Sequence, residues 1–389
     1  MATRTVLCAV AVCLILAAGA GAGLAADQLT PVLMSVLTPP SPIRGTDGLV
    51  YLQYELILAS YSRASFEIDR IEVLDARSGR VVSDVSGPAV LTRLHSFGGA
   101  LRAPVIPPAQ TAAALLFPTF PTMADVPRAL LHRLTLKPQP ANPLLGSRIV
   151  ITGARVGVNF RPPIVLGPPL EGSRWYATGS CCLKVHSAAI LPINGRLFIA
   201  QRYAIDWIRL DARGRAYVGD PKVNANWISY GARLLAVRSG TVVSVLDGLP
   251  ERVPGQLPSD TTLRNVTGNH VILDMGGGYF AFYAHMQPGS IRVKLGQRVR
   301  QGQVLGLLGN SGNSSAPHLH LHVMDSSSPL GSQPMPYVFA RLIARGKVPP
   351  ELSEEELADR GAPLITTKRG VERRVLPMHN WVVDFPPAR

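Results

Sequence analysis

The sequence predicts an all-β fold in more than one domain. Gly and Pro are abundant, at 36 and 34 of 389 residues, which suits many short strands joined by turns. Alternating apolar and polar residues recur through the first 160 positions, as half-buried strands require. Charged residues make up 16% and hydrophobic residues 47%, so we expect a folded chain, and its length favours two domains over one core.

The region 27–160 is expected to form the first domain. Val50–Leu56 begins one strand, and Ser65–Leu74 alternates as a half-buried strand should. Ala76–Gly79 reads as a hairpin turn, and Arg148–Val158 is again rich in strand-forming residues. Several strands at this spacing predict an antiparallel β-sandwich of immunoglobulin-like type. The histidines of this region are isolated, so we expect them to be structural.

Proline-rich motifs predict the next boundaries. Residues 161–174 read as a stiff linker, because two X-Pro-Pro motifs fall within them. We place a second domain at 175–345 and a C-terminal tail at 346–389. The tail has an acidic stretch that predicts one or two helical turns, followed by a strand-like segment at 379–385 that is expected to pack back on a domain.

The N-terminus, residues 1–26, predicts a secretory signal peptide. Arg4 supplies positive charge, an apolar run extends from Val6 to Ala18, and small residues follow. The alternative is an uncleaved anchor, but the run is short for a membrane span. We therefore expect a secreted or cell-envelope protein with no stable membrane span after signal removal.

Only two cysteines lie outside this signal, and they are adjacent. Neighbouring cysteines do not easily satisfy ordinary disulfide geometry, so the chain is not a disulfide scaffold. Cys181 and Cys182 are either free thiols or a strained vicinal disulfide, and the sequence leaves both open.

The net charge of +14 favours an anionic partner. Export argues against nucleic acid, and the Lys and Arg residues are scattered along the chain without forming one stripe. An anionic cell wall or membrane surface fits better. A charge that only keeps the protein soluble is an equally good explanation.

The run His318-Leu319-His320-Leu321-His322 carries the clearest chemical signal. On a strand its period of two places the three imidazoles on one face. Neighbouring ones are roughly 6.6 Å apart along the strand, so two can converge on one metal ion or substrate atom. The outer pair, about 13 Å apart, is not expected to share an ion. Burying such a face without partners would be costly, which favours a functional role.

A predicted hairpin and a predicted strand pair precede this run. Gly268–Asp274 and Tyr279–His285 read as two strands joined by three glycines. Val293–Val299 and Gly302–Gly306 read as a second pair, punctuated by glycine. The loop Asn310–Ser314 then leads into the histidine strand.

These segments together resemble the core of the lysostaphin-type zinc endopeptidases. The resemblance covers about Leu197 to Phe339 and rests on many spaced matches in order: Gly231–Val237, Gly240–Val243, Gly268-Asn269, Tyr283-Ala284-His285, Gly296–Val299, Gly302-Gln303, Gly306, Gly309, Ser311-Gly312 and Pro317-His318-Leu319-His320. It implies a twisted antiparallel sheet with a groove, and a Zn²⁺ ion. It says nothing firm about residues 27–160.

The resemblance also implies roles for individual residues. Asp206 and His320 map onto zinc ligands, and His285 and His318 map onto the two other active-site histidines, which serve as general base and transition-state stabiliser. His322 stands where many relatives carry a carboxylate or an amide. It is either a support for a ligand or a surface imidazole.

One position departs from the family pattern. The family has a zinc-binding His four residues before the Asp, and this chain has Arg202, which stays protonated and cannot ligate zinc. Three hypotheses follow: His186 or Gln201 supplies the missing ligand; the domain has lost catalysis and keeps the groove for binding; or Arg202 forms a salt bridge with Asp206. Because the other four site residues are retained, we favour a working site with His186 as the metal ligand.

The sequence thus predicts a secreted zinc-dependent endopeptidase that hydrolyses peptide bonds in bacterial cell-wall peptidoglycan. The alternative is a catalytically degenerate domain that binds the wall or regulates other wall hydrolases. The expected partner is peptidoglycan or another cell-wall peptide, without nucleic acid, and the expected state is a monomer. A third class, an adhesin acting through the N-terminal sandwich, would need a partner bound by residues 27–160 alone.

Overall fold

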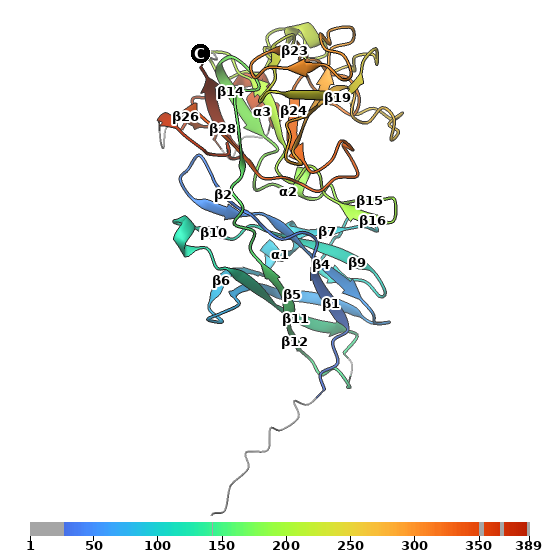
Figure 1. Ribbon diagram of the computed structural model, residues 1–389. Helices are drawn as coiled ribbons and strands as arrows, with labels where there is room; N and C mark the ends of the chain where they lie inside the picture. The colour runs from blue at the N-terminus through green and yellow to red at the C-terminus, as the bar shows by residue number, and fades with distance from the viewer. Residues whose placement is uncertain (1–26, 142, 350–353, 366–368, 387–389) are drawn as a thin grey trace, which may run out of the picture. The chain divides into compact units, whose positions relative to one another are not determined.

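A computed structural model describes residues 27–141, 143–349, 354–365 and 369–386 (Figure 1). The predicted signal peptide lies outside these residues. Residues Pro31–Arg389 form one compact unit. It is built almost entirely of strands, which confirms the all-β prediction; its helical segments are short and comprise α1 (Pro88–Arg93), α2 (Lys184–Ser187), α3 (Glu354–Arg360), η1 (Met123–Asp125) and η2 (Asn224–Asn226). Within the described ranges, no helix is both long and apolar enough to span a bilayer.

Two antiparallel sheets make up most of the N-terminal region. One has the order β1-β4-β9-β7, formed by Val32–Val36, Tyr54–Ser60, Thr111–Leu116 and Leu94–Ser96. The other has the order β12-β11-β5-β6 with β8 paired to β5, formed by Ile149–Gly157, Ala129–Gln139, Ser65–Asp75, Val81–Ser86 and Val105–Ile106. A smaller sheet of order β10-β3-β2 joins Thr119–Phe120, Val50–Leu52 and Pro42–Arg44.

The two larger sheets share one apolar core. Strand β5 buries Phe66, Ile68 and Ile71, while charged residues between them face outward. Both sheets contribute to the same cluster, for example Leu56 from β4 and Leu134 from β11. Two sheets that each bury one face in a shared core are what the predicted sandwich requires. Its immunoglobulin-like type stays a prediction.

A ten-stranded antiparallel sheet dominates the C-terminal part. Its order is β22-β19-β20-β21-β24-β17-β14-β28-β26-β27, formed by Arg298–Val299, Gly240–Leu246, Asn269–Asp274, Phe280–Met286, Leu319–Met324, Ile205–Arg209, Gly172–Thr178, Trp381–Phe385, Leu342–Lys347 and Gly370–Glu372. Figure 1 labels β14, β19, β24, β26 and β28 of this sheet. The hairpin expected around the three glycines is formed by β20 and β21. The histidine run lies at the centre of the sheet, on and just before β24.

The expected pairing of 293–299 with 302–306 is wrong. β22 pairs with β19, whereas β23 (Val304–Leu307) pairs with β18 (Arg233–Leu235) in a separate two-stranded sheet. Turns at 295–296 and 301–302 precede the two strands, which pair with different neighbours. A further hairpin joins β15 (Leu191–Ile193) and β16 (Arg196–Phe198).

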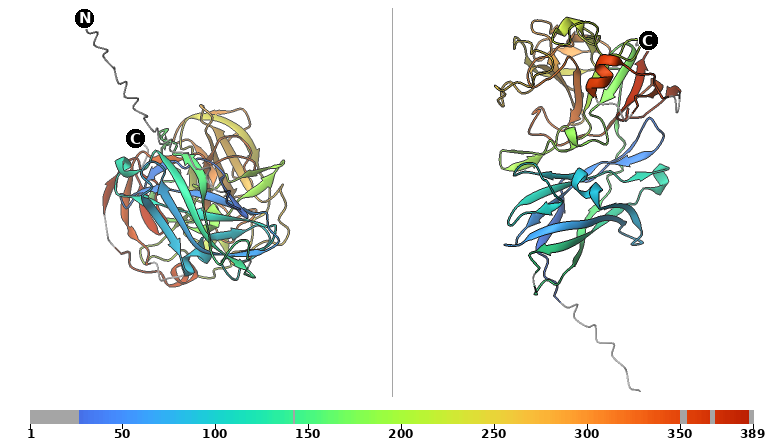
Figure 2. Two further views of the ribbon diagram at one scale, coloured as in Figure 1. Left: turned by 90° about the horizontal axis from the view of Figure 1, so that it is seen from below. Right: turned by 180° about the vertical axis from the view of Figure 1, so that it is seen from behind.

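The stretch expected to be a linker and the C-terminal tail both contribute secondary structure. β13 (Ile164–Leu166) pairs in parallel with β25 (Tyr337–Phe339). In the tail, β28 lies between β14 and β26, and α3 lies beside this part of the sheet (Figure 2). Leu357 of α3 belongs to one buried cluster with Tyr176 of β14 and Val382 of β28. The tail therefore completes the large sheet. The exact domain boundaries stay predictions.

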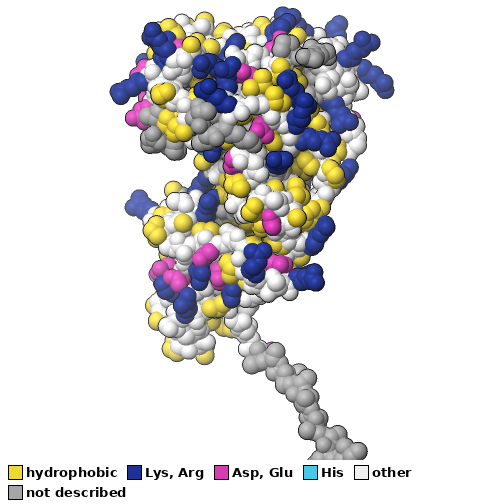
Figure 3. All heavy atoms as spheres, turned by 90° about the vertical axis from the view of Figure 1, so that its left-hand side faces the viewer, with side chains coloured by type: hydrophobic (Ala, Val, Ile, Leu, Met, Phe, Trp, Pro, Cys, Tyr) yellow, Lys and Arg dark blue, Asp and Glu magenta, His cyan; other side chains and the backbone are white. Residues whose placement is uncertain are grey.

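Basic side chains are spread over the face drawn in Figure 3 and form no single stripe there. Asp and Glu side chains are fewer on that face, in keeping with the net charge of +14. The picture agrees with the expectation of a diffuse positive surface.

The buried histidine of the sandwich predicts a pH-dependent stability. His132 is fully buried; its Nε2 lies 2.8 Å from the Tyr54 hydroxyl and its Nδ1 2.9 Å from the Ala154 carbonyl. Burial lowers the pKa of His132 from 6.5 to about 4. Between pH 6.5 and pH 4, His132 is therefore protonated in the unfolded chain but neutral in the folded chain. The stability that is present above pH 6.5 is lost as the pH falls towards 4.

We expect the unfolding free energy to fall by about 2 kcal/mol from pH 7 to pH 5 because of His132 alone. Urea unfolding of the wild type and of His132→Gln at both pH values measures this. An equally steep pH dependence in the two proteins would contradict the assignment.

Candidate metal centre

Asp206 and His320 face each other across two neighbouring strands. The register of β17 and β24 makes them direct cross-strand partners, and His320 Nδ1 lies 2.8 Å from Asp206 Oδ1. Such pairs have their β-carbons about 5 Å apart, so their side chains meet without any loop having to close. Burial would raise the pKa of Asp206, but the three surrounding imidazoles outweigh it and hold this pKa well below its usual value. Asp206 is therefore a stable anion.

His186 reaches the same carboxylate from α2. Its Nε2 lies 3.3 Å from Asp206 Oδ2, and its Nδ1 lies 2.8 Å from the Gly179 carbonyl oxygen. A carbonyl oxygen only accepts, so Nδ1 carries a hydrogen and the lone pair of the neutral ring is on Nε2. Burial disfavours the protonated ring, but Asp206 outweighs it and raises the pKa of His186.

Gly179 makes room for this arrangement. Its φ of +66° lies in the left-handed region, and a β-carbon there would come within 2.5 Å of His186 Cε1. Any other residue would push the imidazole away from Asp206. Between Gly179 and His186, Cys181 and Cys182 form the vicinal disulfide that was one of the two expected alternatives.

The donor set matches a zinc site. One ligand atom each from His186, Asp206 and His320 lies within 4.8 Å of the others. Two imidazoles and a carboxylate are a set that catalytic zinc accepts, with a fourth position left for substrate or water. The structure thus brings together the three residues expected to bind metal.

His285 and His318 border this centre. His285 Nδ1 lies 2.7 Å from the Ser311 carbonyl, and His318 Nδ1 lies 2.8 Å from the Ala316 carbonyl, so each ring presents its Nε2. The ring centres are 4.7 Å apart, and His318 Nε2 is 3.6 Å from Asp206 Oδ1. With His320 they form a second group of atoms within 4.8 Å.

The backbone and charge state of His285 are both unusual. Its φ of 60° is a left-handed conformation that a side-chain-bearing residue adopts at a cost of order 1–3 kcal/mol. Burial and the nearby His318 and His320 hold its pKa well below the usual value. The ring is therefore a neutral proton acceptor at physiological pH.

His322 contacts the ligand rather than the metal position. Its Nδ1 lies 2.9 Å from His320 Nε2, and the ring of Phe282 packs against both imidazoles. Among the described residues it belongs to neither group of candidate ligands. His322 is 1% exposed, so it is not a surface imidazole.

Arg202 does not approach Asp206. Its guanidinium is 2% exposed and forms an ion pair with Glu55, which is fully buried, while Thr38 Oγ1 accepts a further hydrogen bond at 2.5 Å. The hypothesis of an Arg202–Asp206 salt bridge is therefore wrong. Sequence reasoning missed Thr38 and Glu55, because no local pattern links Glu55 to a partner 147 positions away.

A cleft of about 680 Å³ opens beside these groups. Asp206, His318 and Gly179 line its floor, and Val185, Tyr217, Trp227 and Leu257 are among the residues of its walls. This size and partly apolar lining are typical of small-ligand and peptide sites.

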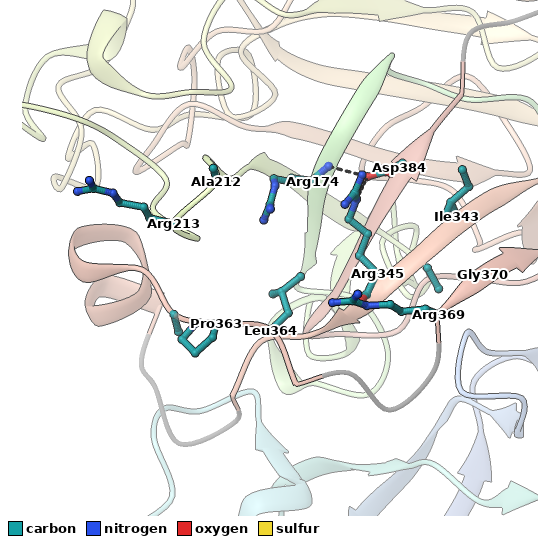
Figure 4. Close-up of a pocket in the computed structure, with 12 residues that line it drawn as sticks. Arg174, Ala212, Arg213, Ile343, Arg345, Pro363, Leu364, Arg369, Gly370 and Asp384 are labelled. Atoms are coloured by element: carbon teal, nitrogen blue, oxygen red, sulfur yellow. Dashed lines mark hydrogen bonds and ion pairs between the residues drawn. The ribbon is translucent and has the colours of Figure 1, made fainter.

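A second pocket of similar volume, about 690 Å³, has different chemistry (Figure 4). Among the described residues that line it are four arginines and one carboxylate, that of Asp384, to which Arg345 donates a hydrogen bond. None of these described lining residues is a histidine, so the pocket is not a candidate for the metal chemistry.

Comparison with known proteins matches residues 227–332 to the family profile "Peptidase family M23". This segment is an M23 domain. It contains His285, His318 and His320; Asp206 and His186 lie before it, so their association with the site rests on the geometry above. The chain is 35% identical over 89 residues to a peptidoglycan DD-endopeptidase of Vibrio cholerae, covering 21% of this chain and 20% of that protein.

Two further proteins resemble part of this chain. A glycyl-glycine endopeptidase of Staphylococcus capitis is 35% identical over 74 residues, which is 18% of this chain and 20% of that protein. The chain thus spans about a fifth of the length of these curated relatives. The catalytic domain of lysostaphin from Staphylococcus simulans is 24% identical and aligns over 42% of this chain and 88% of its own, with a TM-score of 0.23 that carries no weight here.

The Arg202–Glu55 pair predicts an unusual sensitivity to loss of one charge. Glu55→Gln leaves the buried guanidinium uncompensated, so we expect it to lower the unfolding free energy by about 3–5 kcal/mol. Glu67→Gln is the matched control, because Glu67 is 36% exposed, and its pair with Lys137 should contribute less than about 1 kcal/mol. Chemical unfolding of both variants measures the difference, and equal losses would refute this view of the pair.

Proposed function

We propose that the protein is an exported, zinc-dependent endopeptidase that cleaves peptide bonds in bacterial peptidoglycan. The observation that carries this proposal is the position of His186. His186 offers a ligand atom within 4.8 Å of those of Asp206 and His320, and it would replace the histidine that the family resemblance led us to expect at position 202. Two relatives named peptidoglycan DD-endopeptidases support the substrate class, and a relative named a glycyl-glycine endopeptidase supports cleavage between amino acids.

His186, Asp206 and His320 are the residues that would hold zinc. Zinc bound there would act as a Lewis acid that polarises a carbonyl group and acidifies water. His322 would keep the His320 ring in place through their hydrogen bond, as partners of metal ligands commonly do. The anionic Asp206 would balance the charge of the cation.

His285 and His318 would handle the protons. Each ring is fixed by a backbone carbonyl at Nδ1 and presents Nε2 on the same side as Asp206. The neutral Nε2 of one ring would accept a proton from the attacking water, and the other would hydrogen-bond to the oxygen that becomes negative in the transition state. The leaving amine would then take up the proton. Which ring takes which role is set by how the substrate lies in the cleft.

The cleft would bind an extended peptide rather than the glycan strand. Tyr217 and Trp227 offer flat apolar contacts, and Asp206 and His318 line the same cleft. A peptide cross-bridge, rich in small residues and amide groups, fits this lining. We propose that the protein acts outside the cytoplasm as a monomer.

The proposal predicts about one zinc ion per chain. His320→Ala and His186→Ala should each remove most of it, because two remaining ligands hold zinc weakly. His95→Ala, a change in the N-terminal sandwich, is the control and should keep the metal. Elemental analysis after purification without chelators measures the content. A wild-type protein without zinc would overturn the enzyme proposal and favour a wall-binding role. Full zinc content in His186→Ala would reject only the role of His186 as a ligand.

The proton-transfer roles predict a different pattern for the other two histidines. His285→Ala and His318→Ala should keep their zinc but lower kcat by roughly 10²- to 10⁴-fold. Release of soluble fragments from purified peptidoglycan measures the activity, and elemental analysis confirms the metal. Near wild-type rates in both variants would contradict the assignment.

A further inference from the structure

Gln53 joins the two segments that carry the candidate metal ligands. Its amide nitrogen donates to Ser187 Oγ at 2.7 Å and to the Arg202 carbonyl oxygen at 2.7 Å. Ser187 directly follows His186, and Arg202 precedes Asp206 by four residues. A single side chain from the N-terminal sandwich therefore hydrogen-bonds both to α2, at Ser187, and to the turn that contains Arg202.

The neighbours of Gln53 show how the sandwich presents it. Along this stretch side chains alternate, so Gln53 and Glu55 point to one side and Tyr54 to the other. Tyr54 belongs to the sandwich core and bonds His132. Gln53 and Glu55 instead bond residues 187 and 202, and both are at most 3% exposed.

Apolar packing surrounds these polar contacts. Ile57 and Ala113 of the sandwich form one buried cluster with Ile190 and Ile199. These two isoleucines lie between His186 and Arg202 in the chain, so this stretch packs on the sandwich at both positions. Lys184 adds a hydrogen bond from its ammonium group to the Leu94 carbonyl.

The contact with the sandwich holds α2, which the large sheet does not hold. Asp206 and His320 are held by strand pairing, but α2 has four residues and belongs to no sheet. A helix of one turn has little stability of its own. The position of His186 therefore depends on Gly179, on one side, and on the tether from Ser187 to Gln53 on the other.

We propose that Gln53 is a positioning residue for His186, so that the N-terminal sandwich is a structural part of the metal centre. The inference rests on the proposed zinc site. Gln53 touches neither metal nor substrate; it acts by fixing Ser187 and Arg202 relative to each other. Glu55 reinforces it by holding the Arg202 side chain away from the ligands.

Zinc affinity of the full chain, measured by competition with a chromophoric chelator, tests this. Gln53→Leu and Ser187→Ala should weaken binding by about 10-fold or more, as loss of an outer partner of a metal ligand does. Tyr54→Phe is the matched control: it removes one buried hydrogen bond from the same stretch but none to residues 187 or 202, so its affinity should stay within about twofold of wild type. Thermal unfolding of each metal-free variant verifies that it is folded.

A second readout separates positioning from general stability. The visible absorption of the Co²⁺-loaded protein reports the ligand geometry, and it should change in Gln53→Leu but not in Tyr54→Phe. In the double variant Gln53→Leu/Ser187→Ala the loss should be less than the product of the two single effects, because both remove the same hydrogen bond. If Gln53→Leu does not fold, Ser187→Ala decides the matter.

The outcomes distinguish the two proposals. A wild-type protein that binds no zinc removes the proposed function and this inference with it. A wild type that binds zinc, with Gln53→Leu and Ser187→Ala as tight as Tyr54→Phe, overturns the positioning role alone. Weaker binding and an altered Co²⁺ spectrum confined to the two tether variants support it.

Discussion

The Asp206 carboxylate is the constraint on which the centre depends. It is held between strands, kept ionised by three imidazoles, and each of those rings owes its orientation partly to it. A half-buried anion without such neighbours would be unfavourable, and so would a cluster of imidazoles without an anion. The carboxylate and the histidines therefore stabilise one another electrostatically. The rigid pairing of β17 with β24 is what allows this balance to exist before any ligand arrives.

Much of this centre could be predicted from local patterns. The period of two in the histidine run places its imidazoles correctly, and spaced glycines located the hairpin that ends at His285. Strand partners were less predictable: β22 and β23 read as a pair because they are adjacent in sequence, yet each completes a different sheet. Strand pairing is a contact between segments distant in sequence, and the spacing of residues within one segment does not determine its partner.

The contacts of Arg202 were beyond the reach of sequence reasoning for a related reason. A buried arginine needs a partner, but nothing in the sequence singles out Glu55 among 25 acidic residues. His186 could be proposed as a substitute ligand only because the expected one was missing. Its tether to Gln53 emerged from the fold alone, since a glutamine in a strand-like stretch carries no signal of its own.

The buried pair of Arg202 and Glu55 also couples two positions that are far apart in the sequence. A change of Arg202 to a neutral residue would leave the Glu55 carboxylate buried without its ion-pair partner, and a change of Glu55 would do the same to the guanidinium. Either substitution alone is therefore unfavourable, whereas apolar residues at both positions would remove the two charges together. Mutational tolerance at position 202 thus depends on the residue at position 55.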